Sequence, residues 1–339
     1  MRPLAVSMGD PAGIGPEVIV KAWLQRSTAQ LQPFFVCSAC EPLAVAARQI
    51  GADVPLVRIA DPAAAMAMFG DALPVLPIEL GALATPGQPD AANGAAVIDA
   101  IRMAVAAVSA GTAQAVVTAP IAKSVLYTAG FTHPGHTEFL ASLAGIHWPG
   151  SGWTPVMMLA APQLRVVPAT IHISLAQVPG ALNAEELART IRIVVRALVE
   201  DFGITGPRIA VAGLNPHAGE GGAMGREDLD LIAPVVQQLA AEGLAVRGPL
   251  PADTMFHPAA RATYDAAIAM YHDQALIPIK TIAFDDAVNV TLGLPFVRTS
   301  PDHGTAFDIA GRGAANPASM VAALRLASEL GVRRGAKPS

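Results

Sequence analysis

Short apolar runs alternate with helix-forming segments along almost the whole of this 339-residue chain. In the first half, apolar runs predict strands at 4–7, 34–37, 56–59 and 115–118, and helical patterns lie between them at 16–26, 41–49 and 92–110. The second half continues with strands at 155–160, 165–173, 208–212 and 267–271 and helices at 183–202, 227–242 and 318–330. This alternation is typical of an α/β fold built on a parallel or mixed sheet.

Helix start signals support this reading of the sequence. Pro16 suits the first position of a helix, and Asn183 with Glu186 forms a capping-box pattern. Asn316-Pro317 combines a cap residue with a first-turn proline before the last helix. No repeat or linker divides the chain, so residues 1–339 are expected to form two interleaved α/β subdomains whose boundaries the sequence does not mark.

The composition excludes several classes of protein. Apolar residues make up 53% of the chain and charged residues 14%, which argues against disorder. The 22 Lys and Arg against 27 Asp and Glu leave a net charge of −5, which gives no overall attraction for nucleic acid. Uncharged stretches at 103–122 and 139–164 are interrupted by polar residues, Gly and Pro, and Asp10 comes too early for a signal peptide. We expect a soluble, cytoplasmic protein that binds no membrane.

Two common nucleotide-binding motifs are absent. The glycines at 9, 13 and 15 have the wrong spacing for G-x-G-x-x-G, and in the glycine-rich stretch 219–225 Met224 stands where the third glycine belongs. A Walker A sequence is also missing. The sequence therefore argues against an ordinary Rossmann fold and against a P-loop ATPase.

Cys37 and Cys40 form a C-x-x-C pattern at an expected strand–helix junction. Such a pattern occurs in redox pairs, but one pair cannot complete a four-thiolate zinc site. We favour the interpretation that these are two small residues at the junction.

Three histidines stand at or just after the ends of predicted strands: His172, His217 and His272. In open α/β folds, ligands gather at the carboxyl ends of strands. Three imidazoles suit a borderline divalent metal such as zinc, with a position left open for a substrate oxygen. Each histidine alone could be an ordinary buried residue, and the sequence does not show that the three converge.

Two further segments contain groups suited to anions. Residues 135–138, Gly-His-Thr-Glu, resemble a helix N-terminus, with Thr137 near the cap and free backbone N–H groups. Lys280, Asn289 and Arg298 lie in otherwise apolar sequence and could clamp a phosphate. Asp253, Asp273 and Lys280 are candidate proton acceptors near a metal.

The segment 302–317, DHGTAFDIAGRGAANP, resembles the adenosine-binding loop of the isocitrate and isopropylmalate dehydrogenases. Those enzymes bind NAD or NADP without a Rossmann fingerprint. The resemblance implies that His303, Gly304, Asp308 and Asn316 bind the cofactor.

Further motifs, in order from about residue 4 to residue 330, narrow the resemblance. They are MGDPAGIGPE at 8–17, GHTEFLA at 135–141, GLNPHAGEGG at 213–222, GPLPADTMF at 248–256 and YHDQALIPIK at 271–280. Together they identify the chain as a member of the 4-hydroxythreonine-4-phosphate dehydrogenase family of vitamin B6 biosynthesis. The resemblance implies a two-domain α/β/α subunit of the isocitrate/isopropylmalate dehydrogenase-like type, working as a homodimer with its active site at the interface.

The resemblance also implies the roles of the candidate residues. Metal ligands drawn from both subunits, for Zn, Mg or Co, would be His172, His217 and His272. Substrate-binding residues would be His136, Thr137, Lys280, Asn289 and Arg298. The implied reaction oxidises 4-phosphooxy-L-threonine to a 3-keto acid, which loses CO2 to give 3-amino-2-oxopropyl phosphate.

Three alternatives stay open at this point. A paralogue could oxidise erythronate or threonate 4-phosphate, or a cis-dihydrodiol dicarboxylate, because a carboxylate could use the same cations. A phosphate acyltransferase or a non-catalytic metal-binding protein would leave the segment 302–317 without a role. At position 119, the family more often has Asn where this chain has Ala119, which bears on substrate identity.

Overall fold

The computed structural model describes residues 2–133, 135–150 and 152–335 and divides into two compact units. Unit 1 comprises residues 1–155 and 294–339, and unit 2 comprises residues 156–293. The chain therefore leaves unit 1 once and returns to it for its last 46 residues.

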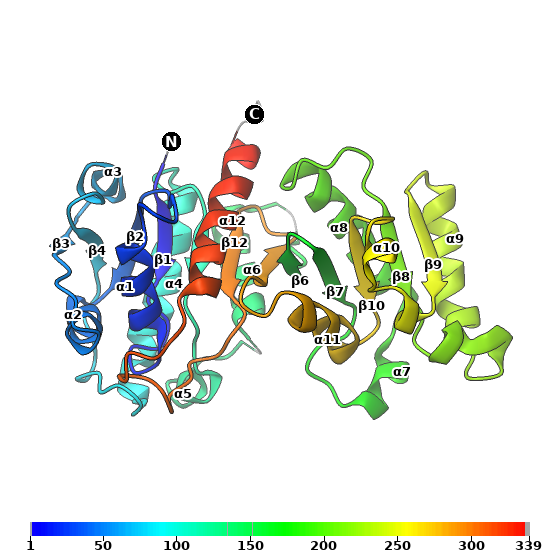
Figure 1. Ribbon diagram of the computed structural model, residues 1–339, viewed down its shortest axis with the longest axis horizontal. Helices are drawn as coiled ribbons and strands as arrows, with labels where there is room; N and C mark the ends of the chain where they lie inside the picture. The colour runs from blue at the N-terminus through cyan, green and yellow to red at the C-terminus, as the bar shows by residue number, and fades with distance from the viewer. Residues whose placement is uncertain (1, 134, 151, 336–339) are drawn as a thin grey trace. The chain divides into compact units, whose positions relative to one another are not determined.

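Unit 1 is built on parallel strands in the order β3-β4-β2-β1-β5-β12 (Figure 1). The strands are β1 (Leu4–Ser7), β2 (Phe34–Ser38), β3 (Leu56–Arg58), β4 (Leu73–Pro77), β5 (Val116–Thr118) and β12 (Arg298–Pro301). The helices are α1 (Gly15–Leu24), α2 (Cys40–Gln49), α3 (Ala65–Met68), α4 (Gly94–Ser109), α5 (Lys123–Thr128), α6 (His136–His147) and α12 (Ala318–Gly335).

Unit 2 is built on strands in the order β11-β6-β7-β10-β8-β9. These are β6 (Val156–Ala161), β7 (Leu164–Pro168), β8 (Ile209–Ala212), β9 (Val246–Leu250), β10 (Ala266–Ala269) and β11 (Val288–Leu292). The pairs β11–β6 and β6–β7 are antiparallel, and the other neighbours are parallel. The helices are α7 (Val178–Ala181), α8 (Ala184–Glu200), α9 (Ala233–Ala241), α10 (Pro258–Arg261) and α11 (His272–Ile282). The predicted α/β fold with a mixed sheet is confirmed.

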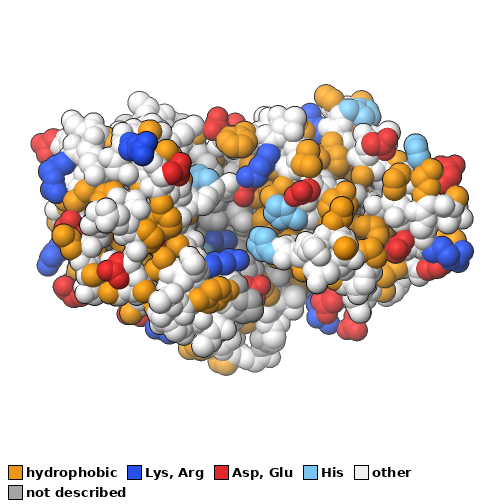
Figure 2. All heavy atoms as spheres, turned by 90° about the horizontal axis from the view of Figure 1, so that it is seen from below, with side chains coloured by type: hydrophobic (Ala, Val, Ile, Leu, Met, Phe, Trp, Pro, Cys, Tyr) orange, Lys and Arg blue, Asp and Glu red, His pale blue; other side chains and the backbone are white. Residues whose placement is uncertain are grey.

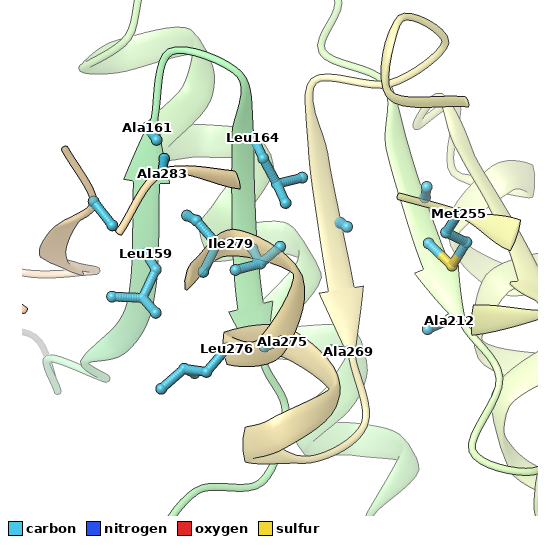
Figure 3. Close-up of a cluster of buried hydrophobic side chains, with 14 of the residues drawn as sticks. Leu159, Ala161, Leu164, Ala212, Met255, Ala269, Ala275, Leu276, Ile279 and Ala283 are labelled. Carbon is cyan, nitrogen blue, oxygen red and sulfur yellow. The ribbon is translucent and has the colours of Figure 1, made fainter. Parts of the chain in front are cut away.

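One buried hydrophobic cluster of unit 2 joins its sheet to α11 (Figure 3). Ala275, Leu276 and Ile279 of α11 recur at helical spacing and belong to one buried cluster with Leu159 and Leu164 from the sheet. This packing fixes the position of α11, whose first residue is His272.

The segment 91–109, which contains α4, is apolar and long enough to cross a membrane by length and composition. It packs against β1 and β2, and 56% of its most apolar 18-residue stretch is buried within the protein. One face, including Val97, Ile101 and Val105, is buried, so α4 fits the role of a core helix.

Several predicted boundaries need correction. The strand expected at 165–173 is wrong beyond Pro168, because β7 ends there and 169–173 leaves the sheet. The sequence predicts no helix in the segment that forms α11, which contains Pro278. The expected helix at 227–242 begins as a π-helical turn at Asp228–Ile232 before α9.

The two cysteines lie where the sequence expects them, at the end of β2 and the start of α2. Both are free thiols, Cys37 is buried, and burial raises the pKa of its thiol. A raised pKa disfavours the reactive thiolate. These features fit the structural role better than a redox role.

Candidate active site

The three candidate histidines follow the carboxyl ends of three neighbouring parallel strands in unit 2. His172 comes after β7, His272 after β10 and His217 after β8, and the sheet order here is β7-β10-β8. The carboxyl edge of this sheet is therefore the place where ligand chemistry is expected.

The structure brings two of these histidines together. The ring centroids of His172 and His272 are 5.7 Å apart, close enough for both rings to contact one ion. Both line a cavity of about 220 Å³, together with Asp273, Tyr271 and Thr170. On the face seen in Figure 2, histidine side chains lie beside exposed hydrophobic side chains.

Asp273 orients His272. Its Oδ1 lies 2.8 Å from Nδ1 of His272. A carboxylate there accepts the Nδ1 proton and leaves Nε2 with its lone pair, as metal-ligating histidines require. The pair of rings, with this carboxylate behind one of them, fits a divalent metal.

His217 lies on an unusual loop. Its φ is 52°, and the next four residues, 218–221, also have φ between 43° and 81°. Ala218 and Glu220 have side chains that disfavour this left-handed conformation, which costs on the order of 1–3 kcal/mol per residue. Such strain persists only where surrounding contacts impose it.

Asp228 supplies contacts that hold the start of this loop. The Asp228 carboxylate is buried and accepts hydrogen bonds from the backbone N–H groups of Leu214, at 2.7 Å, and Asn215, at 3.1 Å. It also accepts one from Nδ2 of Asn215 at 3.0 Å. The loop that carries His217 is thus tied to a buried anion.

The predicted triad is not assembled within the part of the chain that the structure describes. No group of three His, Cys, Asp or Glu side chains there is placed to hold one metal ion. One chain therefore presents the pair His172 and His272, with His217 apart from them.

The other unit 2 candidates lie on different elements. Asp253 is exposed in a short turn, Ala252–Thr254. Lys280 is in the last turn of α11, eight residues or about 12 Å of helix beyond His272. Asn289 faces Leu159 across the β11–β6 pair, and its buried Oδ1 has no hydrogen-bond partner among the described residues.

A second cluster forms in unit 1 around Arg298, the first residue of β12. Its Nη2 donates to Oγ1 of Thr118 at 2.7 Å and lies 3.3 Å from Nδ1 of His136. Burial lowers the pKa of Arg298 to about 9, so the guanidinium still carries its charge at neutral pH. Arg298 thus comes together with His136 across 162 residues of sequence.

The Arg298 contact fixes the state of His136. Arginine can only donate, so Nδ1 of His136 accepts and the ring proton sits on Nε2. Burial, Arg298 and Lys123 all lower the pKa of His136 well below 6.5, which keeps the ring neutral. Its buried Nε2 has no hydrogen-bond partner among the described residues, which leaves a donor available to a ligand oxygen.

The N-terminus of α6 adds further donors to this cluster. Gly135 is the N-cap and has no side-chain cap, so the first backbone N–H groups, including that of Thr137, need partners. Thr137 is the second residue of the helix rather than its cap. The amine of Lys123 lies beside Gly135. Thr118 and Lys123 are not among the site residues predicted from the sequence. The available signal was a hydroxyl and a charged side chain at the two ends of the otherwise apolar segment TAPIAK.

The segment 302–317 packs against the glycine-rich loop at the start of the chain, within unit 1. The backbone N–H of Ile14 donates to the carbonyl of Thr305 at 2.9 Å. A side chain at Gly13 would come within 3.0 Å of the same carbonyl. Ala119 is buried against Gly9 and Gly15 of this loop, which explains why a small residue fits at that position.

The candidate cofactor residues lie on that segment. Nδ1 of His303 is 3.1 Å from the carbonyl of Gly304, and its Nε2 is buried without a hydrogen-bond partner among the described residues. Asn316 caps α12, because its Oδ1 accepts the backbone N–H of Ala318 at 3.0 Å. Asp308 lies in a turn between these two residues.

Comparisons with known proteins show which family this chain belongs to. The sequence profile of the family described as "Pyridoxal phosphate biosynthetic protein PdxA" matches residues 30–327. The chain belongs to this family. The 4-hydroxythreonine-4-phosphate dehydrogenase of Bradyrhizobium diazoefficiens is 56% identical over 337 residues, covering 97% of each chain. The predicted family and enzyme class are therefore confirmed.

Two solved structures support the fold. The crystal structure of 4-hydroxythreonine-4-phosphate dehydrogenase from Klebsiella pneumoniae aligns with a TM-score of 0.85 at 39% identity, covering 97% of this chain and 98% of that one. A terephthalate 1,2-cis-dihydrodiol dehydrogenase from Burkholderia xenovorans aligns with a TM-score of 0.63 at 31% identity, covering 97% and 98%. By sequence, the enzyme is therefore a 4-hydroxythreonine-4-phosphate dehydrogenase. It shares its fold with the cis-dihydrodiol dehydrogenase.

Proposed function

We propose that this enzyme oxidises 4-phosphooxy-L-threonine with NAD or NADP to a 3-keto acid that decarboxylates to 3-amino-2-oxopropyl phosphate. The observation that carries this proposal is the donor cluster of Arg298, His136 and the N-terminus of α6. A charged guanidinium, a neutral imidazole donor and free backbone N–H groups suit a phosphate dianion. The names of the curated relatives support the same substrate.

His172 and His272 are proposed to hold a divalent metal, with His217 as the third ligand. Imidazole ligands favour zinc or cobalt over magnesium, which prefers oxygen. When bound, such an ion acts as a Lewis acid toward the substrate hydroxyl. Asp273 holds His272 in the tautomer that presents Nε2 to the ion.

The remaining site residues keep the roles that the family resemblance implies. Lys280 and Asn289 are assigned to the substrate, and His303, Gly304, Asp308 and Asn316 to the cofactor. The proton acceptor is one of Asp253, Asp273 and Lys280. Because the carboxylate of Asp273 already accepts a hydrogen bond from Nδ1 of His272, its main proposed role is to orient the His272 ring.

We further propose a cytoplasmic homodimer in which a second copy completes the metal site. Exposed apolar side chains lie close in sequence to the histidine pair in unit 2: Leu175 is 67% exposed, Ile277 63% and Phe284 72%. Large exposed apolar side chains beside a site are typical of an interface. A partner there would supply the third ligand that one chain does not bring to His172 and His272.

An assay of NADH or NADPH formation tests the substrate assignment. The metal-loaded enzyme is offered 4-phosphooxy-L-threonine, D-erythronate 4-phosphate, threonate 4-phosphate and a terephthalate cis-dihydrodiol, each with and without a chelator. We expect the highest kcat/KM with 4-phosphooxy-L-threonine and loss of activity with chelator. A higher kcat/KM with the unphosphorylated dihydrodiol would show that the donor cluster serves a carboxylate instead.

The phosphate contacts are tested separately. Arg298→Met and Lys280→Met keep much of the side-chain volume but remove the charge. Because charge-assisted hydrogen bonds contribute about 1.5–3 kcal/mol, each change should raise the KM for the phosphorylated substrate about tenfold or more. The Kd for NAD should change little. A weakened Kd for NAD with an unchanged substrate KM would assign these residues to the cofactor.

A further inference from the structure

Two residues of α1 make contacts that the reaction chemistry does not require. Glu17 and Lys21 stand one turn apart, and Nζ of Lys21 lies 2.7 Å from Oε1 of Glu17. Glu17 is 3% exposed, although an ion pair of this spacing usually lies on a helix surface. The carboxylate of Glu17 therefore lies in the interior of unit 1, where a charge needs partners, and Lys21 reaches it from a partly buried position near the surface.

The partners come from the segment 302–317. Lys21 Nζ donates to the carbonyl of Gly313 at 2.9 Å and to the carbonyl of Ala315 at 2.7 Å. With Glu17, these bonds use all three donors of the ammonium group. In return, the backbone N–H of Ala315 donates to Oε1 of Glu17 at 2.8 Å.

These contacts hold an irregular piece of backbone. Residues 302–317 contain no helix or strand, and Gly311 and Gly313 both have positive φ. A stretch without its own ladder of hydrogen bonds keeps one conformation only if other elements supply bonds. The Glu17–Lys21 pair supplies three of them, at the point where the segment turns toward α12.

The same contacts border a hollow at the surface of unit 1. Lys21, Gln49, Arg312, Gly313 and Pro317 line this hollow, whose volume is about 640 Å³. Gly313 is thus both a wall of the hollow and an acceptor for Lys21. Loss of the Lys21 bonds would free this wall to move.

We propose that Glu17 and Lys21 are positioning residues that hold the segment 302–317 in the conformation that binds the nicotinamide cofactor. The inference rests on the proposed assignment of His303, Gly304, Asp308 and Asn316 to that cofactor. In this role, Glu17 and Lys21 act on the segment and not on the reacting atoms. They act by reducing the conformational freedom that the segment would otherwise lose when the cofactor binds.

The test uses the metal-loaded, full-length enzyme and measures NAD binding by calorimetry in the absence of substrate. Lys21→Met should raise the Kd for NAD about tenfold or more, since charged hydrogen bonds to two carbonyls are lost. The kcat at saturating NAD and the KM for the phosphorylated substrate should stay unchanged. Hydrogen exchange of the free enzyme should become faster in 309–317 and stay unchanged in α4.

Two further variants show whether a change in NAD binding comes from the lost contacts with the segment 302–317. Glu17→Gln/Lys21→Met removes both charges, so it avoids leaving Glu17 buried alone, and it should show the same rise in Kd. Arg189→Met is the matched control, because Arg189 pairs with Glu185 one turn away on α8, at 3.0 Å and far along the chain from 302–317. This control should leave the Kd for NAD and the exchange rates unchanged.

Asp308→Ala separates failure of this inference from failure of the cofactor assignment. If Asp308→Ala weakens NAD binding and the folded double variant does not, the positioning role of Glu17 and Lys21 is wrong and the cofactor assignment stands. If Asp308→Ala leaves NAD binding unchanged, the segment is not the cofactor site, and both are overturned.

Discussion

His172→Ala and His272→Ala are each expected to abolish turnover. The two rings lie 5.7 Å apart in one cavity, so each variant removes one of two adjacent proposed metal ligands. Loss of the Lewis acid costs several kcal/mol of barrier, which corresponds to a fall in kcat/KM on the order of a thousandfold or more. Metal analysis of the purified variants should show the ion missing, while circular dichroism shows an intact fold.

Asp273→Asn provides a graded comparison for this experiment. It keeps the shape of the side chain but removes the charge that lies 2.8 Å from Nδ1 of His272. Loss of such an orienting partner typically lowers metal affinity by about 10–100-fold, so activity should return at high metal concentration. Full activity and full metal content in His272→Ala would remove the histidine pair from the mechanism.

Mixing two inactive variants should restore activity if the metal site is shared between subunits. His217→Ala and His272→Ala chains are mixed under conditions that exchange subunits. About half of the dimers are then hybrids, and each hybrid has one intact site and one site that lacks both histidines. The expected recovery is therefore roughly a quarter of wild-type activity, measured as NADH formation after hybrid formation has been verified.

The structure provides a matched control for this mixture. Because His172 and His272 lie together in one chain, they are expected to serve the same site from the same subunit. A mixture of His172→Ala and His272→Ala should then recover nothing, since each site of every dimer lacks one ligand of the pair. Recovery in this second mixture would show that His172 and His272 serve different sites. No recovery in either mixture would mean that the site is not shared.

Much of this protein could be predicted from local sequence. The apolar run at 4–7 coincides with β1, and Asn183 caps α8 by accepting the backbone N–H groups of Glu185 and Glu186. Both signals operate over a few residues, because strand burial and helix capping depend on near neighbours. The placement of His172, His217 and His272 after strands also followed from local pattern.

Elements whose apolar pattern is interrupted by proline or glycine were not predicted from the sequence. The strand β4 has the sequence LPVLP, β9 contains Gly248-Pro249, and α11 contains Pro278. Proline removes a backbone donor and glycine weakens a strand, so local propensity argues against each of these elements. Tertiary packing overrides that propensity, as the contacts of Ile279 with the unit 2 core illustrate.

The sequence by itself determined the α/β class, the family and the residue types at the candidate site, because motif spacing and periodicity are properties of neighbouring residues. Tertiary structure alone decided which of those residues meet. It placed His272 beside His172 and left His217 apart, joined Arg298 to His136, and tied Lys21 to Gly313 across 292 residues. The physical reason is that these contacts depend on strand order and on how the chain returns to unit 1, which local periodicity does not encode.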